Sequence, residues 1–574
     1  MTQVKRKPVV IAGGGPAGSV AALCLRKLGH EVVLFERQKF PRYRIGESLL
    51  PGTMSILTRL GIADRVIAAN FTKKRAATFI WGGGRPPWSF TFATPKTAPW
   101  TFDHSYQVTR AEFDQILLNA AQERGADVRE LHEVSEFELG DGNGPIQLTW
   151  KNGDQSGTME TDFMIDATGA SALVGRKYNL RQWDEYYRNT AVWWYWKGGK
   201  RYKGDLEGNI FSVSYENGWM WIIPLKDDVY SVGVVTDVGA NEKIRKMGAE
   251  AFYRGEIAKC PLATEILATA TPTDELRVLR EWSYDSKQLS MGRAFMCGDS
   301  GCFIDPLFSQ GVHLATYSGM MAAAAIDYLY EHPEDSAQVH EWYDRSYRAA
   351  YQRYHKFLAG FYSCNGHESD FWRGRRIAGA SDQRLAGKEW FMTMTGQNID
   401  AGAEGTRELE DGASMLATLW QHRSAEVNDE FDETELQSRR LKWGTELLKQ
   451  YQSMASIRWK GKEVRLVRSF KVHPTTFKLE HQTFLGDEHG RTMTSYVLTD
   501  EHRKLFASLA DQPLSFNQLT DRLKEIKGGQ GTPFEIVRRL FDDGFLEGRT
   551  AAGEVVHLQN VLRFGGVGAE DDIS

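Results

Sequence analysis

A lysine and a glutamate stand in stretches of the sequence where their side chains could do chemistry. Lys74 lies in FTKKRAATF and Glu47 in RIGESLLPG. Burial disfavours an ammonium ion, so a desolvated lysine has reason to lose its proton and become nucleophilic. A carboxyl group such as Glu47 can relay a proton, act as a gate or accept a structural hydrogen bond. The ordinary alternative for Lys74 is a solvated surface lysine.

The stretch WMWIIP, residues 219–224, offers bulk without an acid or a base. Trp219 and Trp221 are large and rigid, and Pro224 fixes the end of the strand. Such residues can act by exclusion, as a barrier that keeps two reactants apart. Read alone, the same stretch is an ordinary core strand.

The turn PLFSQG, residues 306–311, precedes an apolar helix. Backbone N–H groups at a helix start can hold a small anion in a desolvated pocket. Ser309 can set the turn or donate, beside Gln310 and Gly311. The turn also serves as a helix cap, and both roles can hold at once.

A nucleotide site is predicted near the N-terminus. The stretch KPVVIAGGGPAGSVAALCLRKLGHEVVLFER predicts a strand, a glycine turn, a helix and a second strand that ends at Glu36. The glycines allow a tight turn, a close approach to a pyrophosphate and close helix packing, and Glu36 can bind ribose hydroxyls. The alternative is a glycine turn in an unrelated α/β fold. The predicted contacts are Gly13, Gly15, Pro16, Ala17, Gly18, Glu36 and Arg37.

Three further stretches resemble the FAD-binding segments of glutathione-reductase-type flavoproteins. GRAFMCGDSGCFIDPLFSQG resembles the second FAD fingerprint, where Asp299 would bind the ribityl chain. MIDATGASALVG resembles the strand that recrosses the nucleotide, and VTRAEFDQILLNAA the segment whose arginine, Arg110, reaches the flavin. The resemblance also implies cofactor contacts from Arg44, Ser48, Pro306 and Gly311.

Together these motifs resemble the flavin-dependent halogenases over about residues 5–360. The family motif WxWxIP matches Trp219, Trp221, Ile223 and Pro224. FxxPxxSxG matches Phe303, Pro306, Ser309 and Gly311, and FxxKxGA matches Phe71, Lys74 and Ala77, with Ala76 where glycine is usual and Lys73 adjacent. RIGESLLPG resembles the flavin-edge loop. The loop and the long C-terminal extension look most like the chloramphenicol-biosynthesis type.

The resemblance implies an enzyme that uses FAD, supplied as FADH2, together with O2 and chloride or bromide. Ser309, Gln310 and Gly311 would be the halide residues, and a flavin C4a-hydroperoxide would oxidise the halide to hypohalous acid. Lys74 would deliver it to an organic substrate, free or tethered to a carrier protein as an acyl group, in natural-product biosynthesis. A separate flavin reductase is the implied partner. In the same subfamily an aspartyl link to the flavin is expected, for which Asp285 or Asp274 is the candidate, beside the alternative of an exposed loop aspartate.

Two other classes of function share parts of this pattern. An FAD-dependent monooxygenase (a hydroxylase), or an isoprenoid-chain reductase, shares the FAD segments without the lysine and the tryptophans. A flavoprotein scaffold is the non-enzymatic alternative. The sequence holds no second GxGxxG unit for NAD(P)H.

The elements that would position these residues form an α/β chain with a Rossmann-type FAD-binding fold. We expect residues 1–360 to form this domain, with a substrate-side sheet inserted at about 75–110 and 185–240. Residues 361–465 predict a mostly helical connection. Residues 466–574 predict a domain with a winged-helix-like unit and a disordered tail.

Composition narrows the partners. The chain has 574 residues and a net charge of −5, and residues 500–550 hold eight Lys/Arg and nine Asp/Glu, so nucleic acid and anionic membrane are not expected partners. Five scattered cysteines without a CxxC pair argue against a disulfide framework or a metal site. With no signal-like or membrane-spanning segment, we expect a cytoplasmic protein.

Overall fold

The structure is a computed structural model with two compact units. It describes residues 6–82, 87–92, 99–140, 144–363, 365, 367, 369–373, 442, 445–460, 465–486, 498–527, 532–542 and 544–558. Unit 1 comprises Met1–Ala378, Lys388–Ile399 and Val472–Leu479. Unit 2 comprises Gly379–Gly387, Asp400–Lys471 and Glu480–Ser574.

A six-stranded sheet forms the centre of the nucleotide half of unit 1, in the order β18-β19-β11-β1-β2-β7. All neighbours run parallel except β18 and β19. The first strand, VVIA, is buried throughout, as expected for a parallel strand covered on both faces. The strands are β1 (Val9–Ala12), β2 (Val32–Glu36), β7 (Asp127–Glu130), β11 (Met164–Asp166), β18 (Ser290–Met291) and β19 (Ala294–Met296).

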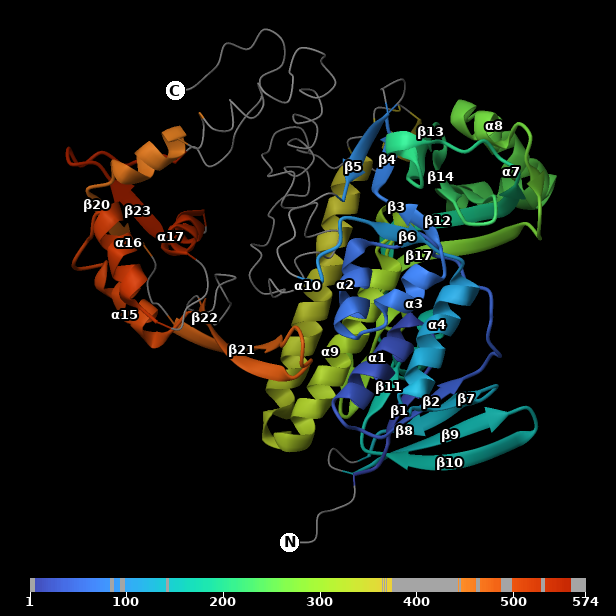
Figure 1. Cartoon of the computed structure of the whole chain (residues 1–574), viewed down its shortest axis with the longest axis horizontal. Helices are drawn as coiled ribbons and strands as arrows, with labels where there is room; N and C mark the ends of the chain where they lie inside the picture. The colour runs from blue at the N-terminus through green and yellow to red at the C-terminus, as the bar shows by residue number, and fades with distance from the viewer. Residues whose placement is uncertain are drawn as a thin grey trace. The chain divides into compact units, whose positions relative to one another are not determined.

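Helices cover this sheet, and Figure 1 shows α1, α4 and α9 gathered beside it. The helix α1 packs against both α4 and α9, and α9 against α10. No helix within the described ranges is long and apolar enough to cross a membrane. The helices of this half are α1 (Pro16–Lys27), α2 (Pro51–Arg59), α3 (Ala63–Ala68), α4 (Arg110–Glu123), α5 (Leu173–Lys177), α9 (Gly311–Glu331), α10 (Ser336–Ser363) and α11 (Asp370–Arg373).

Two small sheets flank the nucleotide half. An antiparallel sheet contains β8 (Glu133–Glu138), β9 (Ile146–Asn152) and β10 (Gln155–Thr161). A second pair contains β3 (Thr72–Lys74) and β6 (Ser105–Gln107), with Lys74 opposite Ser105. This pair is separate from the large sheet described next, although β6 lies within the predicted 75–110 insertion and β3 directly precedes it.

An eight-stranded, largely antiparallel sheet forms the other half of unit 1. Its path is β16-β12-β15-β14-β13-β4-β5, and β17 also pairs with β12. The strands are β4 (Ala76–Ile80), β5 (Trp88–Thr91), β12 (Arg181–Lys197), β13 (Ile210–Tyr215), β14 (Gly218–Pro224), β15 (Val229–Asp237), β16 (Thr271–Pro272) and β17 (Arg277–Ser286). The sheet therefore extends beyond the predicted range of 185–240, because β17 returns from residues 277–286 to pair with β12.

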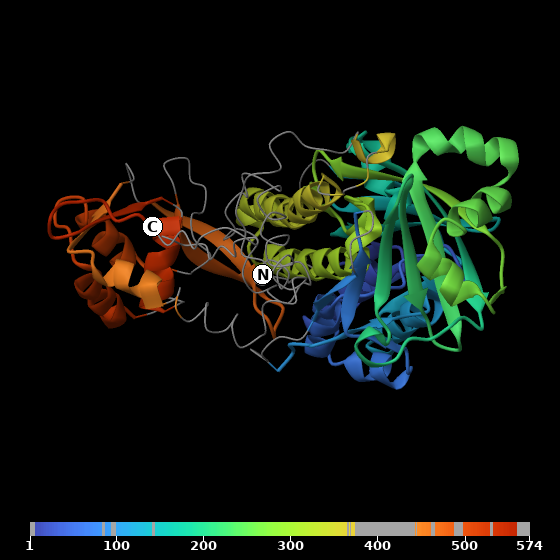
Figure 2. The ribbon, with the colours of Figure 1, turned by 90° about the horizontal axis from the view of Figure 1, so that it is seen from above.

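One face of the large sheet is covered by three helices, α6 (Asn241–Met247), α7 (Ala249–Ile257) and α8 (Pro261–Leu267). Figure 2 shows these green helices beside the long strands. Trp194, Trp196, Met220 and Ile222 belong to the apolar core on this side. Because successive side chains in a strand point to opposite faces, Trp193, Tyr195, Trp219 and Trp221 lie on the other face.

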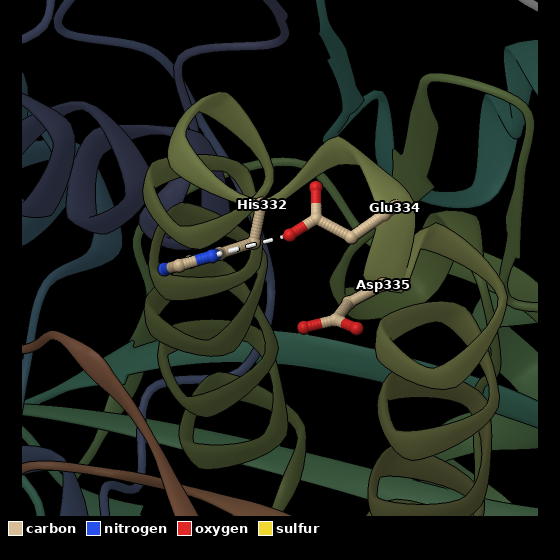
Figure 3. A group of neighbouring side chains, drawn as sticks. All are labelled: His332, Glu334 and Asp335. Atoms are coloured by element: carbon tan, nitrogen blue, oxygen red, sulfur yellow. Dashed lines mark ion pairs between the residues drawn. The ribbon is translucent and has the colours of Figure 1, made fainter.

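The turn between α9 and α10 carries a small acidic group (Figure 3). His332 and Glu334 are exposed, and His332 Nδ1 lies 3.5 Å from Glu334 Oε1. The neighbouring Asp335 accepts a hydrogen bond of 2.7 Å from the hydroxyl of Tyr328. The ligand-type atoms of the three residues lie within 4.8 Å of one another. Exposed acidic turns of this kind are common without an ion, so the cluster does not by itself define a metal site.

Unit 2 has its own hydrophobic core. Three helices contribute to it, α15 (Asp500–Ser508), α16 (Phe516–Glu525) and α17 (Pro533–Asp542), and α15 and α16 begin with capping boxes at Thr499 and Ser515. The strands β20 (Ser456–Trp459) and β23 (Leu546–Arg549) pair antiparallel, and β21 (Arg465–Val472) pairs with β22 (Leu479–Gly486). The three helices and β23 lie within the range where a winged-helix-like unit is predicted, whereas β20 precedes that range, and the winged-helix assignment stays a prediction.

The boundaries of unit 2 differ from the predicted start at residue 466. Residues 447–459 already contribute Leu447, Tyr451 and Trp459 to its core, because the preceding helix and β20 are amphipathic. Conversely, Val472–Leu479 belong to unit 1, where the fully buried Phe477 lies under Lys27, whose Nζ is 4.8 Å from the ring centroid. Most of the predicted helical connection, and the predicted disordered tail GAEDDIS (568–574), lie outside the described residues.

Candidate active site

The glycine turn after β1 has the shape that a dinucleotide requires. A Cβ added at Gly13 would lie 2.2 Å from the carbonyl oxygen of Ala167, and one at Gly18 would lie 1.9 Å from the carbonyl oxygen of Gly13. These positions therefore admit only glycine. The helix α1 begins after Gly15 without a side-chain cap among the described residues, so its first N–H groups are available to a phosphate. Pro16 and Ala17 line this helix start and are buried.

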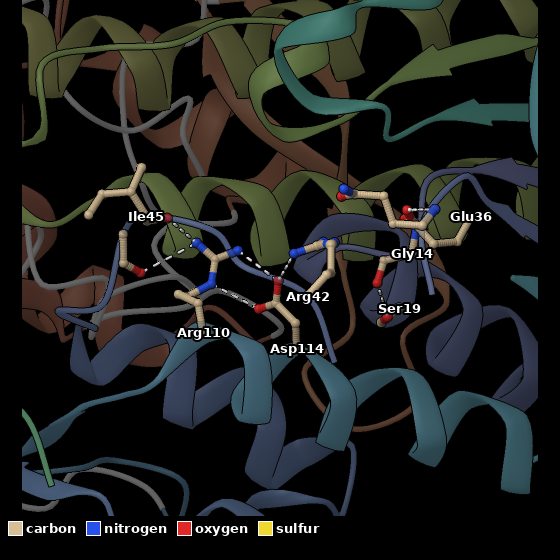
Figure 4. A network of polar contacts seen from close by, with 9 residues as sticks. Gly14, Ser19, Glu36, Arg42, Ile45, Arg110 and Asp114 are labelled. Atoms are coloured by element: carbon tan, nitrogen blue, oxygen red, sulfur yellow. Dashed lines mark hydrogen bonds and ion pairs between the residues drawn. The ribbon is translucent and has the colours of Figure 1, made fainter. Parts of the chain in front are cut away.

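The acidic residue at the end of β2 is tied to the same turn. Glu36 Oε2 accepts a 2.8 Å hydrogen bond from the Gly14 N–H, and Oε1 accepts one of 2.8 Å from the Gln38 N–H (Figure 4). Glu36 is buried, and each carboxylate oxygen retains a lone pair. The arrangement fits a ribose binding at Glu36. The adjacent Arg37 points to the surface, 3.9 Å from Glu133.

Arg110 lies at the start of α4 and holds the flavin-edge loop in place. Its guanidinium binds Asp114 with two hydrogen bonds, of 2.8 and 2.9 Å, and donates a third of 2.6 Å to the carbonyl oxygen of Ile45 (Figure 4). Arg42 binds the same carboxylate at 2.9 Å. Asp114 is fully buried, so two arginines compensate for its charge. Arg110 therefore fixes the loop that carries Glu47.

Asp299 follows β19, at the edge of the sheet where a dinucleotide is expected to bind. Desolvation raises the pKa of Asp299 to about 6, and the nearby positive charges of Arg110, Arg44 and Arg181 oppose that rise. Arg44 itself is exposed. Asp166, before the predicted DATG loop, accepts hydrogen bonds from Thr168 and Val174 and so shapes that loop.

The strand β6 connects the two chemical residues predicted from the sequence. On one side it pairs with β3, which carries Lys74. On the other side the Val108 N–H donates to the carbonyl oxygen of Glu47 at 2.7 Å, and the Leu49 N–H donates to that of Tyr106 at 3.0 Å. The flavin-edge loop and the lysine strand are therefore built on one short strand.

Lys74 is the buried member of the lysine pair. Its side chain is 1% exposed, whereas Lys73, which points to the opposite face, is exposed. Lys74 Nζ donates a 3.0 Å hydrogen bond to the carbonyl oxygen of Leu49 and lies 5.2 Å from the ring centroid of Phe92. Desolvation lowers the pKa of Lys74 to about 7. A substantial fraction of the amine is thus neutral and nucleophilic at neutral pH.

Glu47 is a buried acid with one free oxygen. Tyr195 OH lies 2.5 Å from Glu47 Oε1, while Glu47 Oε2 has no hydrogen-bond partner among the described residues. Desolvation raises the pKa of Glu47 to about 7, against the opposing effects of the Tyr195 and Ser231 hydroxyls and of the charge on Arg110. At neutral pH the group is divided between its acid and base forms, as a proton relay requires.

The tryptophans of WMWIIP form a continuous aromatic surface on the face of the large sheet away from α6–α8. Trp219 and Trp221 have ring centroids 6.1 Å apart, and Trp221 and Trp193 are separated by 6.2 Å. Trp219 is 1% exposed. Its Nε1 has no partner in the described structure, whereas Trp221 Nε1 donates to Ser231 at 3.2 Å.

Asp305 anchors the turn PLFSQG (residues 306–311), which is called the halide turn because a halide is predicted to bind there. This buried carboxylate accepts hydrogen bonds from Asn189 at 2.7 Å and from Tyr362 at 2.9 Å, and it caps the Pro306–Phe308 turn through the Leu307 N–H. Ser309 then adopts a left-handed conformation with φ of 61°. The Ser309 N–H donates a hydrogen bond to the carbonyl oxygen of Pro306.

The start of α9 is open to a small ion. No side chain within the described ranges caps this helix start, and a Cβ added at Gly311 would meet no atom within 4 Å. Gln310 is fully buried and donates to the carbonyl oxygen of Asp305, while its Oε1 is without a partner in the described structure. An exposed set of N–H donors in an apolar surrounding fits a halide.

Phe79 joins the halide turn to the tryptophan surface. By strand register Phe79, Ser212, Trp221, Gly233 and Trp193 follow one another across five strands on one face. The Phe79 ring centroid is 5.6 Å from that of Phe308, in the halide turn. The structure therefore brings WMWIIP, PLFSQG and the Lys74–Glu47 assembly together, since Tyr195 of the same face contacts Glu47.

Asp285 and Asp274 are both occupied by arginines. Asp285, in β17, forms an ion pair of 2.5 Å with Arg348, and Asp274 forms one of 2.6 Å with Arg277. Asp285 is partly buried, whereas Asp274 is half exposed.

Several residues of the site were not found from the sequence. Tyr195, Ser231 and Gly233 belong to the tryptophan face, Tyr43 contacts Tyr195 and Trp193, and Asp305 anchors the turn PLFSQG. Gly233, in the middle of the apolar strand SVGVV, is the detectable signal among them, because an interior glycine marks a close approach. The residues Trp193–Trp196 divide by alternation, with Trp194 and Trp196 in the core and Trp193 and Tyr195 on the tryptophan face.

Comparisons with known proteins agree with this geometry. The tryptophan halogenase family model matches residues 8–102 and 94–397, and the model of the chloramphenicol halogenase CmlS C-terminal domain matches residues 443–561. A tryptophan 2-halogenase from Chondromyces crocatus is 36% identical over 420 residues, which cover 71% of this chain and 79% of the relative.

Two solved structures extend the similarity to three dimensions. CmlS, a flavin-dependent halogenase, is 44% identical with a TM-score of 0.81, covering 99% of this chain and 100% of that chain. The myxobacterial chondrochloren halogenase CndH is 33% identical with a TM-score of 0.61, covering 72% and 92%. The predicted family, its α/β fold and its use of FAD, halide and O2 are confirmed, and halogenation is favoured over hydroxylation. The chain belongs to the flavin-dependent halogenases.

Proposed function

We propose that this halogenase oxidises chloride or bromide to hypohalous acid and transfers the halogen through Lys74 to an organic substrate. When bound, reduced FAD and O2 supply the oxidising equivalents. The FAD site would be formed by the glycine turn of a Rossmann-type fold, by Glu36 and by Asp299. The observation that carries the proposal is the burial of Lys74, whose amine is held by one backbone carbonyl and has a pKa near 7.

Lys74 receives the hypohalous acid, either by a hydrogen bond or by forming an N–halogen bond. In the second case the neutral amine attacks the halogen, and the oxygen leaves as water after it takes up the amine proton. A protonated ammonium has no lone pair for this step, so desolvation of Lys74 favours it. Glu47 holds a proton near this chemistry.

Trp219 and Trp221 keep the substrate away from the oxidant. Their rings, with Trp193, cover the sheet face that contacts the flavin-edge loop through Tyr195 and Glu47. Ser309 sets the turn with its left-handed backbone, and the backbone N–H groups of Gln310 and Gly311 hold the halide in a turn that Asp305 anchors. A barrier and a halide pocket together distinguish a halogenase from a hydroxylase.

The reaction assay combines the protein with a flavin reductase, FAD, NADH, O2 and chloride or bromide. A general halogen acceptor reports free hypohalite, and candidate substrates are supplied both free and tethered to a carrier protein as acyl groups. Halogenated product supports the proposal. Hydroxylated product without halogenation would contradict the proposal.

The flavin linkage is tested by acid precipitation. We propose Asp285 as the attachment residue, with Asp274 as the alternative, because Asp285 lies in β17 next to Tyr284, whose hydroxyl donates to the carbonyl oxygen of Asp299. Flavin that remains with the precipitate, and is released by Asp285→Asn but not by Asp274→Asn, supports this choice. Flavin that appears wholly in the supernatant rules out a covalent bond.

The C-terminal unit is proposed to cover the substrate or to dock a carrier protein. Its balanced charge between residues 500 and 550 does not suit nucleic acid. We also propose a separate flavin reductase as partner and a cytoplasmic location. Deletion of unit 2 should therefore spare flavin binding and reduce turnover of the native substrate.

A further inference from the structure

A chain of hydrogen bonds leads from the buried Glu47 to the protein surface. The Tyr195 hydroxyl lies 2.5 Å from Glu47 Oε1 and 3.1 Å from the hydroxyl of Tyr43. The exposed fraction rises along the chain, from 3% at Glu47 to 8% at Tyr195 and 42% at Tyr43. We propose that Tyr195 and Tyr43 are positioning residues that form a proton path, by which Glu47 regains its proton from solvent. This inference rests on the proposed function of Glu47.

The reaction itself requires such a supply. Two-electron reduction of O2 by the reduced flavin, with oxidation of a halide ion, yields oxidised flavin, hypohalous acid and water only if a further proton is taken up. Transfer of the halogen from hypohalous acid to a C–H position then releases water and leaves the proton balance unchanged. A buried site therefore consumes a proton in each cycle, and Glu47, a buried acid whose Oε2 has no partner among the described residues, can supply it.

The hydrogen atoms along the chain can be arranged in two consistent ways. A tyrosine hydroxyl has one hydrogen to donate and two lone pairs to accept. When Glu47 is ionised, Tyr195 donates to it and Tyr43 donates to Tyr195. When Glu47 is protonated, Glu47 donates to Tyr195, Tyr195 donates to Tyr43, and Tyr43 donates to water. Each pattern becomes the other when one proton moves along each hydrogen bond. A proton is thereby transferred between Glu47 and water while every side chain stays in place.

The phenol groups of Tyr43 and Tyr195 stay neutral during this proton transfer. Desolvation raises the pKa of both Tyr43 and Tyr195, and the nearby carboxylate of Glu47 raises both further. A stepwise path through a phenolate is therefore unfavourable. A concerted shift of protons along the chain needs no ionised tyrosine, so the raised pKa values fit a relay rather than a proton store.

The outer end of the chain is held rigidly although it is exposed. Trp193 Nε1 donates to Tyr43 OH at 2.7 Å and uses one of its two lone pairs. The guanidinium of Arg277 lies 4.1 Å from the Tyr43 ring centroid and is tied to Asp274 at 2.6 Å. An indole N–H cannot accept a proton, and a guanidinium does not release one, so neither diverts the path.

The charged and titratable groups around Glu47 are few. Ser231 and Tyr195 face it from the large sheet, Arg110 from α4 and Arg277 from β17. Among these groups only the tyrosine hydroxyl is hydrogen-bonded to both Glu47 and an exposed residue. The path through Tyr195 is thus the direct protein route between Glu47 and water in the described structure.

The test follows Glu47 itself and does not depend on halogenation. Time-resolved infrared absorption after a pH drop from 9 to 6 measures how fast the carboxyl band of Glu47 appears, and Glu47→Gln identifies that band. We expect Tyr195→Phe and Tyr43→Phe to slow its appearance at least about tenfold. The matched control is Tyr253→Phe, which also loses hydroxyl hydrogen bonds, to Val232 and Trp196, but on the opposite face of the same sheet.

Turnover adds a second readout. In both phenol-to-phenyl variants halogenation should slow most at alkaline pH, where protons are scarce, and small diffusible acids should restore it in Tyr43→Ala, which opens the outer end. Band formation at the parental rate in Tyr195→Phe and Tyr43→Phe would overturn the proposal, and so would a Glu47 that stays ionised at pH 6. Normal band kinetics in a protein that does not halogenate would refute the proposed function alone. Because Tyr43 is exposed, its variant tests the path even if Tyr195→Phe fails to fold.

Discussion

The indole of Trp221 lies directly over the backbone of Gly233. The two residues are opposite each other in neighbouring strands, and a Cβ added to Gly233 would lie 2.1 Å from Trp221 Cζ2. The ring can therefore lie flat along the sheet only because position 233 has no side chain. The orientation of the proposed barrier is thus set by a glycine on the adjacent strand.

Replacing this glycine should move the barrier. We expect Gly233→Ala to force the Trp221 ring out of place, to cost about 1–3 kcal/mol of unfolding free energy, and to reduce halogenated product relative to hydrogen peroxide released. Product analysis and denaturant unfolding measure the two effects. Gly255→Ala is the control, because a Cβ there meets no atom within 4 Å. Unchanged partition between product and peroxide would show that Trp221 needs no fixed orientation.

Removing the indole should change the chemistry rather than only the stability. Trp221→Leu should cost roughly 3–5 kcal/mol, as for other large core truncations, and should allow oxygenated product or released peroxide to replace halogenated product. Trp196→Leu removes an indole of similar burial from the opposite face of the same sheet. If both variants give the same product ratio, the tryptophans serve packing alone.

Lys74 and Glu47 predict a bell-shaped dependence of halogenation on pH. The Lys74 amine is active when deprotonated, so its contribution falls as pH drops below about 7. The Glu47 carboxyl is active when protonated, so its contribution falls as pH rises above about 7. We expect an optimum near neutrality and loss of the alkaline limb in Glu47→Gln. Steady-state rates from pH 5 to 9 test this, and a flat profile would contradict it.

The burial of Lys74 should also appear in stability. Its folded-state pKa is depressed from 10.5 to about 7, so its contribution to stability is fully present above pH 10.5 and is lost as pH falls through 7. Lys74→Met should therefore stabilise the protein at pH 6 by on the order of 3–5 kcal/mol and not at pH 10.5. Denaturant unfolding at both values measures this. Exposed Lys73→Met is the control, and an equal pH-dependent gain there would remove Lys74 as the cause.

Much of the fold could be predicted because its signals are local. The glycine turn, the buried strand VVIA and the acidic residue at the end of β2 lie within one short stretch, and the motifs PLFSQG and WMWIIP carry their own spacing. That Lys74 is buried and Lys73 exposed follows from strand alternation and could be seen only once β3 was placed.

The remaining features depend on contacts between distant residues. Tyr43 and Tyr195 are 152 positions apart, and Asp305 meets Asn189 across 116. The return of β17 to β12 and the inclusion of Val472–Leu479 in unit 1 are likewise long-range. Pairings of this kind are set by tertiary packing, and no local propensity in a single sequence encodes them.

Transfer of the halogen by Lys74 is tested most directly by comparing Lys74→Ala with Lys73→Ala in the full assay, with bound flavin, peroxide and halogenated product measured in parallel. We expect Lys74→Ala to keep flavin binding and peroxide formation but to lose halogenated product by more than about a hundredfold, whereas Lys73→Ala keeps all three. Halogenation by Lys74→Ala at a rate close to that of the parent protein would contradict a role of Lys74 in halogen transfer.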